Sequence, residues 1–123
     1  MTTQTLTQAN FESTVAEHQI VLVDFWASWC GPCRMFAPIY EQASESHPDI
    51  VFGKVDTESE QTLAAAARIT SIPTLMAFKH GQLVFAQPGA LPAAALEQVI
   101  TAVRELDLQQ VPAEAADRGQ RGA

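Results

Sequence analysis

The sequence predicts an α/β protein with a central mixed β-sheet of four to five strands, flanked by about four helices. Two observations support this class. Between residues 7 and 56, segments with the helical spacing of apolar residues alternate with continuous apolar runs of strand length. Further along, two strand-like runs follow each other across a short turn. The alternation predicts parallel strands and the hairpin adds an antiparallel pair, so we expect helices on both faces of the sheet.

The first half of the chain predicts two helices and two strands. A helix is expected over residues 7–19, where Phe11 and Val15 lie one helical turn apart. Thr7 is expected to be its N-cap. The continuous apolar run Ile20–Trp26 predicts a central strand, because such a run suits a strand covered on both faces. The next helix and strand are expected over residues 33–46 and 50–56.

The second half predicts a helix, a β-hairpin and a final helix. The hairpin is expected to turn at His80-Gly81, because histidine tolerates positive φ better than most residues and glycine adopts it freely. Pro92 suits the first turn of the final helix. In chain order, these four elements are expected over residues 58–68, 75–79, 83–87 and 92–106.

Length and composition predict one domain followed by a tail. Of the 123 residues, 47% are hydrophobic, which is enough for a sizeable core without disulfide bonds. The domain is expected over residues 1–108. Residues 109–123 are polar with few apolar side chains, and we expect them to be a disordered tail.

Charge and hydropathy exclude several functions. The formal net charge is −7, so the chain is not expected to bind nucleic acid or an anionic membrane surface. No apolar run approaches the ~20 residues of a membrane-spanning helix. The first eleven residues lack the basic start and apolar stretch of a secretory signal. Because a two-cysteine chain without such a signal suits a reducing compartment, we expect a cytoplasmic protein.

The only two cysteines, Cys30 and Cys33, lie directly after the central strand and at the start of a predicted helix. A disulfide between them closes a very small loop, so it stabilises the fold little and is easily exchanged. If Cys30 is the N-cap, its sulfur faces the free N–H groups of the first turn. The amide of Cys33 is then the nearest donor, since Pro32 has no N–H. These contacts and the helix dipole should lower the pKa of the Cys30 thiol.

This arrangement favours disulfide exchange over other uses of a cysteine pair. Cys30 is expected to be the nucleophile, while Cys33, expected to be more buried, resolves the mixed disulfide. Pro32 stiffens the first turn, and Gly31 leaves room for the backbone of a partner. A zinc site needs about four ligands, and none of the three histidines has ligand spacing to the cysteines. Haem attachment needs a histidine where Arg34 stands.

At these residues the sequence resembles the thioredoxin family. The segment VLVDFWASWCGPCR, residues 21–34, is similar to the family's active-site segment nearly throughout. Three further segments are similar to its downstream motifs, in order and at matching separations: Lys54-Val55-Asp56, Ile72-Pro73-Thr74 and Gly89-Ala90-Leu91. The resemblance covers about residues 6–106 and implies the thioredoxin fold. It also implies a general protein disulfide reductase that cycles between the Cys30/Cys33 dithiol and disulfide.

The resemblance also implies roles around the cysteine pair. Asp24 lies mid-strand on the face of Leu22 and Trp26, so we expect it to be buried with a raised pKa. It matches the family's aspartate that moves the proton of the second cysteine. Lys54 matches a lysine that tunes this carboxyl group, and the alternative is an ordinary buried Asp24–Lys54 pair. Pro73 matches the family's cis-proline. The apolar surface that contacts partners around Cys30 is implied to comprise Trp29, Gly31, Pro32, Ile72, Pro73, Gly89 and Ala90.

The family implies which molecules the protein meets. Thioredoxin reductase, which carries FAD and uses NADPH, is expected to restore the dithiol, and disulfide-containing proteins are the expected substrates. The chain has no nucleotide-binding fingerprint, so we expect it to bind neither FAD nor NADPH itself. We also expect no bound metal and a monomeric protein. An alternative function is a redox-gated binding module for one dedicated partner, with little turnover. Pro88 stands where an aliphatic residue is frequent in the family. The preference for partners next to this position is therefore left open.

Overall fold

Five strands form one mixed sheet in the order β1-β3-β2-β4-β5. The computed structural model describes residues 2–108, so the tail predicted over residues 109–123 lies outside the described residues. Strands β1, β2 and β3 are parallel, and β4 pairs antiparallel with β2 and β5. In chain order the elements are β1 (Thr3–Thr5), α1 (Phe11–Glu17), β2 (Ile20–Trp26), α2 (Gly31–Ser46), β3 (Val51–Asp56), α3 (Gln61–Ala66), β4 (Thr74–Lys79), β5 (Gln82–Pro88) and α4 (Ala93–Glu105).

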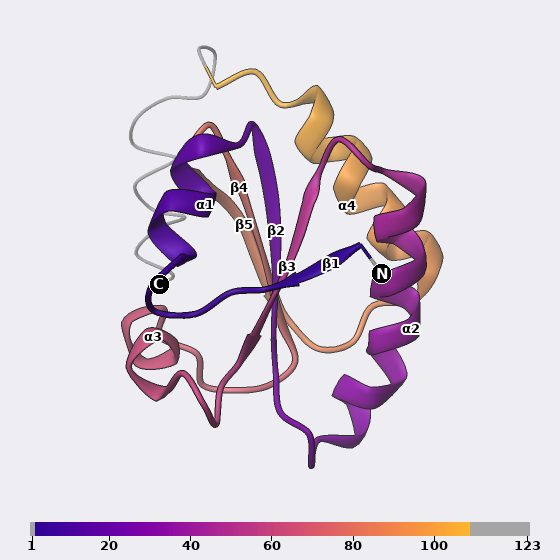
Figure 1. The fold of residues 1–123 in the computed structure, drawn as a ribbon. Helices are drawn as coiled ribbons and strands as arrows, with labels where there is room; N and C mark the ends of the chain where they lie inside the picture. The colour runs from indigo at the N-terminus through magenta and orange to yellow at the C-terminus, as the bar shows by residue number, and fades with distance from the viewer. Residues whose placement is uncertain (1, 109–123) are drawn as a thin grey trace.

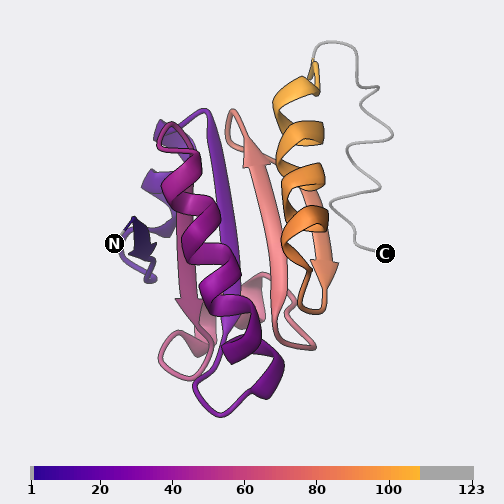
Figure 2. The same cartoon turned by 90° about the vertical axis from the view of Figure 1, so that its right-hand side faces the viewer.

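Helices cover both faces of the sheet, as predicted. Helices α1 and α3 lie on one side and α2 and α4 on the other (Figure 1). Figure 2 views the second side, where α2 and α4 run along the strands. The core therefore has two layers. Because side chains alternate along a strand, Leu22 of β2 packs toward α2 and α4, whereas Val21 and Val23 pack on the opposite side. The predicted central position of β2 is confirmed.

The loops at one end of the sheet come from distant parts of the sequence. Parallel β2 and β3 both end there, while antiparallel β4 begins there. This end lies at the bottom of Figure 1, where the chain passes from β2 into α2. The loop before β4 and the loop between β5 and α4 reach the same end. The cysteine pair, the Pro73 segment and Gly89 are thereby brought to one edge.

The structure corrects the predicted start of the chain. Strand β1 was not predicted. The observed total of five strands nevertheless falls within the expected four to five. Helix α1 begins at Phe11 with Asn10 as its N-cap, so the prediction of Thr7 as N-cap is wrong. The side chain of Asn10 accepts a hydrogen bond from the Thr7 N–H (2.7 Å), and this turn occupies the residues predicted as the first helical turn.

Two other helices have different limits from those predicted. Helix α3 starts at Gln61 rather than residue 58, because the Asp56 carboxylate accepts hydrogen bonds from the Glu58 N–H (2.9 Å) and the Ser59 hydroxyl (3.2 Å). It ends before Arg68, which has a φ of 59° and cannot continue a right-handed helix. Helix α2 begins two residues earlier than predicted, at Gly31.

The predicted hairpin and final helix are present. His80 and Gly81 have φ values of 51° and 80°, and they join β4 to β5. The Lys79 ammonium group donates hydrogen bonds to the carbonyl oxygens of Val103 (2.7 Å), Arg104 (2.9 Å) and Leu106 (2.7 Å). These carbonyls belong to the last turn of α4 and to its C-cap, Leu106, where a helix leaves acceptors free. Lys79 therefore ties the end of α4 to the hairpin.

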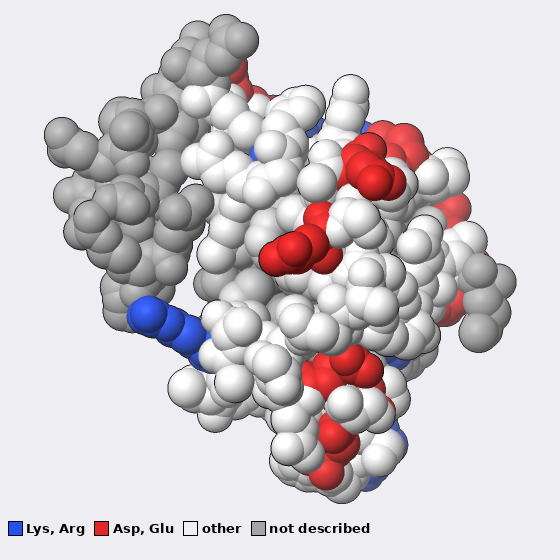
Figure 3. Space-filling view, turned by 60° about the vertical axis from the view of Figure 1, so that its left-hand side comes forward, with Lys and Arg blue, Asp and Glu red and all other residues white. Residues whose placement is uncertain are grey.

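Most of the surface seen in Figure 3 is uncharged, and acidic side chains outnumber basic ones on it. Figure 3 turns the α1 and α3 side toward the viewer and shows separate acidic patches with little basic surface between them. Within residues 2–108, no helix combines the length and the apolar character needed to cross a membrane.

Candidate active site

Cys30 and Cys33 form a disulfide at the start of α2, with their Cα atoms 5.2 Å apart. Cys30 is the N-cap of the helix, as predicted, and has extended backbone angles. The Cys33 N–H donates a hydrogen bond to the Cys30 sulfur, with an N···S distance of 3.2 Å. Pro32 occupies the first turn without offering a competing donor. The sequence therefore places the Cys30 sulfur at the positive end of the helix.

Both cysteines are shielded in this disulfide form. Cys30 is 4% exposed and Cys33 is 3% exposed, so the predicted difference in depth between them is small here. They pack with Ala27, and the side chains of Trp26 and Ile72 cover the cluster. Trp29, by contrast, is 64% exposed beside the pair. An added Cβ at Gly31 would meet no atom within 4 Å, so the approach past Gly31 is open.

Asp24 is fully buried in the middle of β2. Neither of its carboxylate oxygens has a hydrogen-bond partner among residues 2–108. Burial raises the pKa of Asp24 to about 7, and the positive charge of Lys54 opposes part of this rise. The predicted burial and raised pKa are confirmed. A carboxyl group with this pKa can accept or release a proton near neutral pH.

Lys54 lies directly across from Asp24 in the β2–β3 register. Its ammonium group nevertheless sits over the indole of Trp26, 5.0 Å from the ring centroid. The described residues contain no Lys54–Asp24 ion pair within 4.0 Å. No direct ion pair therefore joins the two residues in this structure, and Lys54 acts on Asp24 through its charge at longer range.

Tyr40 is a polar neighbour of Asp24 that the sequence analysis did not single out. Its hydroxyl donates a hydrogen bond to the carbonyl oxygen of Gly53 (2.8 Å) inside the core. Burial, and to a smaller degree the charge of Asp24, raise the pKa of Tyr40 well above its usual value. The phenol therefore stays protonated beside the carboxyl group. Its helical spacing signals burial but does not indicate this bond.

The Ile72–Pro73 peptide bond is cis, as the family resemblance implied. The carbonyl oxygen of Ile72 lies 3.7 Å from the Cys30 sulfur, so this segment lies against the disulfide. Gly89, with a φ of 100°, donates its N–H to the carbonyl oxygen of Pro73 (2.7 Å). This bond joins the β5–α4 loop to the Pro73 segment. Ala90 is exposed in the same loop.

Arg34 and Thr57 hold the loop before the disulfide, a role that the sequence analysis gave to neither residue. The Arg34 guanidinium donates a hydrogen bond to the Ser28 carbonyl oxygen (3.0 Å). Thr57 donates both its N–H (2.9 Å) and its hydroxyl (3.0 Å) to the carbonyl oxygen of Trp26. Both contacts join residues that are not adjacent in sequence, and no local pattern predicts them.

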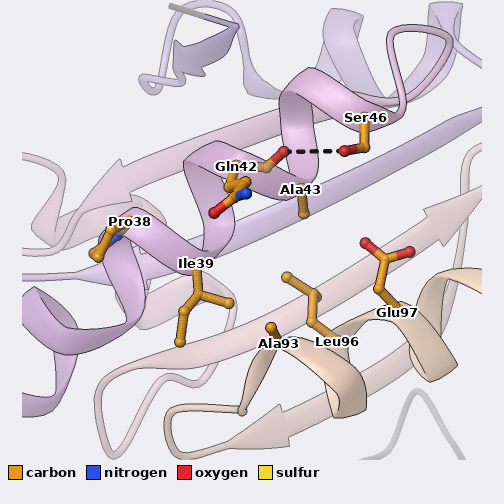
Figure 4. A pocket seen from close by; sticks show the side chains of 8 residues that line it. All are labelled: Pro38, Ile39, Gln42, Ala43, Ser46, Ala93, Leu96 and Glu97. Carbon is orange, nitrogen blue, oxygen red and sulfur yellow. Dashed lines mark hydrogen bonds between the residues drawn. The ribbon is translucent and has the colours of Figure 1, made fainter.

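A separate surface hollow lies between α2 and α4 (Figure 4). None of the predicted site residues lines it. The residues around it are Pro38, Ile39, Gln42, Ala43, Ser46, Ala93, Leu96 and Glu97. In the described part of the chain, no group of three or more histidine, cysteine, aspartate or glutamate side chains could hold a metal ion.

An exchangeable disulfide on a helix N-terminus, a buried carboxyl group and an adjacent cis-proline together define the class of protein-disulfide oxidoreductases. The comparisons with known proteins agree. The family model described as Thioredoxin matches residues 2–102, and the chain belongs to the thioredoxin family. Its fold is the thioredoxin fold, and with this disulfide it is a protein disulfide reductase.

Individual relatives support this assignment. A putative thioredoxin 2 of Streptomyces coelicolor is 58% identical over 106 residues, which cover 86% of this chain and 79% of the relative. Thioredoxin-1 of Saccharomyces cerevisiae is 42% identical over 102 residues, covering 83% and 98% of the two chains. A solved Plasmodium falciparum thioredoxin superposes with a TM-score of 0.75 at 39% identity, covering 80% of this chain and 96% of that one. A Halobacterium salinarum mutant thioredoxin gives a TM-score of 0.78 at 33% identity, covering 89% and 93%.

Proposed function

We propose that the protein reduces disulfides in other proteins by a two-step exchange, with Cys30 as nucleophile and Cys33 as resolving cysteine. The observation that carries this assignment is the hydrogen bond from the Cys33 N–H to the Cys30 sulfur (3.2 Å). It stabilises a thiolate on Cys30, whereas Cys33 lies inside the first turn of α2 and not at its N-cap.

In the first step, the Cys30 thiolate attacks one sulfur of a substrate disulfide. A bond forms between the Cys30 sulfur and that substrate sulfur, and the substrate S–S bond breaks. The leaving thiolate takes a proton from water. The open approach past Gly31 supports this geometry, because a partner's backbone can reach the sulfur there.

In the second step, the Asp24 carboxylate accepts the proton of the Cys33 thiol, through a water molecule. The Cys33 thiolate then attacks the Cys30 sulfur, and the mixed disulfide breaks. The second substrate sulfur leaves Cys30 as a thiolate and takes a proton from water, so the substrate has gained two electrons and two protons and the cysteine pair is oxidised to its disulfide. The pKa of Asp24, raised to about 7 by burial, supports this role, since proton transfer is efficient when the pKa lies near the working pH.

The partner surface is proposed to surround Cys30. Its exposed members are Trp29, Pro32, Gly89 and Ala90, and Ile72 presents its backbone next to the sulfur. An extended partner segment can pair with this backbone as a short added strand. The position of the Ile72 carbonyl oxygen, 3.7 Å from the Cys30 sulfur, supports the idea.

We further propose that an NADPH-dependent thioredoxin reductase, which carries FAD, returns the pair to the dithiol. The chain itself would bind neither cofactor and would act as a monomer. Family membership supports the choice of reductase. The cycle needs surroundings that keep the pair reduced, and we place the protein in the cytoplasm for that reason.

The mechanism predicts that a Cys33→Ser variant accumulates covalent adducts with a disulfide substrate. Oxidised insulin incubated with the reduced variant should give a mixed disulfide through Cys30, visible on a non-reducing gel and lost with dithiothreitol. The matched control is the Cys30→Ser, Cys33→Ser double variant, which should form none. Adducts of equal amount in both variants, or in neither, would contradict the assignment.

The same double variant tests the alternative of a redox-gated binding module. Turnover is measured separately, as insulin reduction by the unmodified protein with thioredoxin reductase and NADPH. Rapid turnover supports the reductase. Slow turnover, with stoichiometric retention of one partner by the double variant, would favour the module.

A further inference from the structure

Lys54 has two neighbours on the same face of β2. Asp24 lies directly opposite it in the β2–β3 register. Trp26 is two residues further along β2, so it is the diagonal neighbour of Lys54, within reach of a long side chain. The lysine can therefore place its ammonium group either against the carboxyl group or against the indole.

The ammonium group takes the indole position, 5.0 Å from the Trp26 ring centroid, while both oxygens of Asp24 remain without a hydrogen-bond partner among residues 2–108. The physical reason lies in hydration. Lys54 and Trp26 are half-buried, so a cation over the ring keeps part of its water. Asp24 is fully buried, and an ammonium group moved against it would lose that water.

We propose that Trp26 is a positioning residue for the proton-transfer site, because its indole holds the Lys54 ammonium group away from the Asp24 carboxyl group. The consequence for catalysis rests on the proton-transfer role given to Asp24 above. Trp26 also packs against the cluster formed by Ala27, Cys30 and Cys33, so it adjoins both the disulfide cluster and the lysine.

The charged and titratable groups around Asp24 support this proposal. Lys54 faces it from β3 and Tyr40 from α2, whereas its partner on β4 is the apolar Leu75. Of these groups only Lys54 lowers the pKa of Asp24, and burial outweighs it. A closer ammonium group would lower that pKa further, and the carboxylate would become a weaker base near neutral pH.

The test is the titration of Asp24, followed by NMR of its carboxyl carbon in the disulfide form of the full chain. Trp26→Leu removes the aromatic face and frees the ammonium group, so the pKa of Asp24 should fall by about one unit or more. Trp26→Phe keeps a ring and should retain most of the unmodified value. Lys54→Met removes the attraction and should raise the pKa above that of the unmodified protein.

A double variant separates this effect from simple entry of water. If Trp26 acts by holding Lys54, then Trp26→Leu should cause no shift once Lys54 is replaced by Met. An equal downward shift in both backgrounds would overturn the proposal, because the indole would then act by excluding water. An unchanged Asp24 titration in Trp26→Leu would overturn it as well.

A measurement on the unmodified protein covers the case in which Trp26→Leu does not fold. Ring currents of the indole should shift the Lys54 side-chain protons next to the ammonium group upfield, and ordinary lysine shifts would overturn the proposal. The pH profile of the Cys33 resolving step, in single-turnover kinetics, tests the role of Asp24 separately. If the Asp24 pKa falls in Trp26→Leu and this profile does not move, the proton-transfer role fails while the positioning of Lys54 stands.

Discussion

Asp24 makes the stability of the folded protein depend on pH. Its pKa rises from 3.8 to about 7 on folding, mainly through burial. Between these values the folded state holds a proton that the unfolded chain has released. Stability from this residue is therefore fully present below about pH 4 and is lost as pH rises through 7, by on the order of 4 kcal/mol.

Asp24→Asn removes this titration, so its stability relative to the unmodified protein should increase as pH rises from 4 to 8. Urea unfolding of both proteins across that range measures the difference. Other acidic residues contribute the same pH dependence of stability in both proteins. One of them is Asp49, and its hydrogen bond with Arg104 lowers the pKa of this carboxyl group to about 2. A difference that stays constant with pH would contradict the burial argument.

At the scale of single elements, Lys79 caps α4 from a neighbouring strand. Its ammonium group donates hydrogen bonds to three carbonyl oxygens at the C-terminal end of α4 at 2.7–2.9 Å, and a charged donor suits the negative end of a helix. Lys79→Met should lower the free energy of unfolding by about 1–3 kcal/mol. Denaturant unfolding measures this, and Lys79→Arg, which keeps the charge, should lose less. Equal stability of the Met variant and the unmodified protein would show that Lys79 does not stabilise the end of α4.

Strand β1 depends on the absence of a side chain at Gly53 of β3. A Cβ there would overlap the Leu6 side chain, which is buried just after β1. Gly53→Ala should therefore destabilise the fold by about 1–3 kcal/mol, as overpacking does. In a Leu6→Ala background, where the space is empty, the same substitution should cost little. Thermal unfolding of the four proteins tests this, and equal costs in both backgrounds would argue against steric overlap.

The elements predicted well from sequence are those whose signal is local. Apart from Asp24, the run Ile20–Trp26 is apolar, and such a run is typical of a strand covered on both faces. Strand β1 has three polar residues and is defined by its pairing with β3, which no local pattern shows. Helices α1 and α3 start late for a related reason, since the Asn10 and Asp56 side chains form turns ahead of them.

The candidate site divides in the same way. Cys30 and its hydrogen bond with Cys33 follow from two cysteines at a helix start, so the sequence predicts them. The cis bond before Pro73 came from the family resemblance, because a proline does not by itself indicate its isomer. The position of Lys54 depends on a choice between two neighbours on the next strand, and only the folded structure decides it.

At the scale of the whole molecule, the length of the sheet separates the disulfide from the opposite end of the protein. The disulfide lies where β2 ends, and antiparallel β4 runs from Pro73 beside it to the exposed His80 turn at the far end. Anchoring the protein to a bead or an electrode through His80 would therefore leave the disulfide facing the solution. An immobilised reagent of this design could act on large proteins as well as on small thiol compounds.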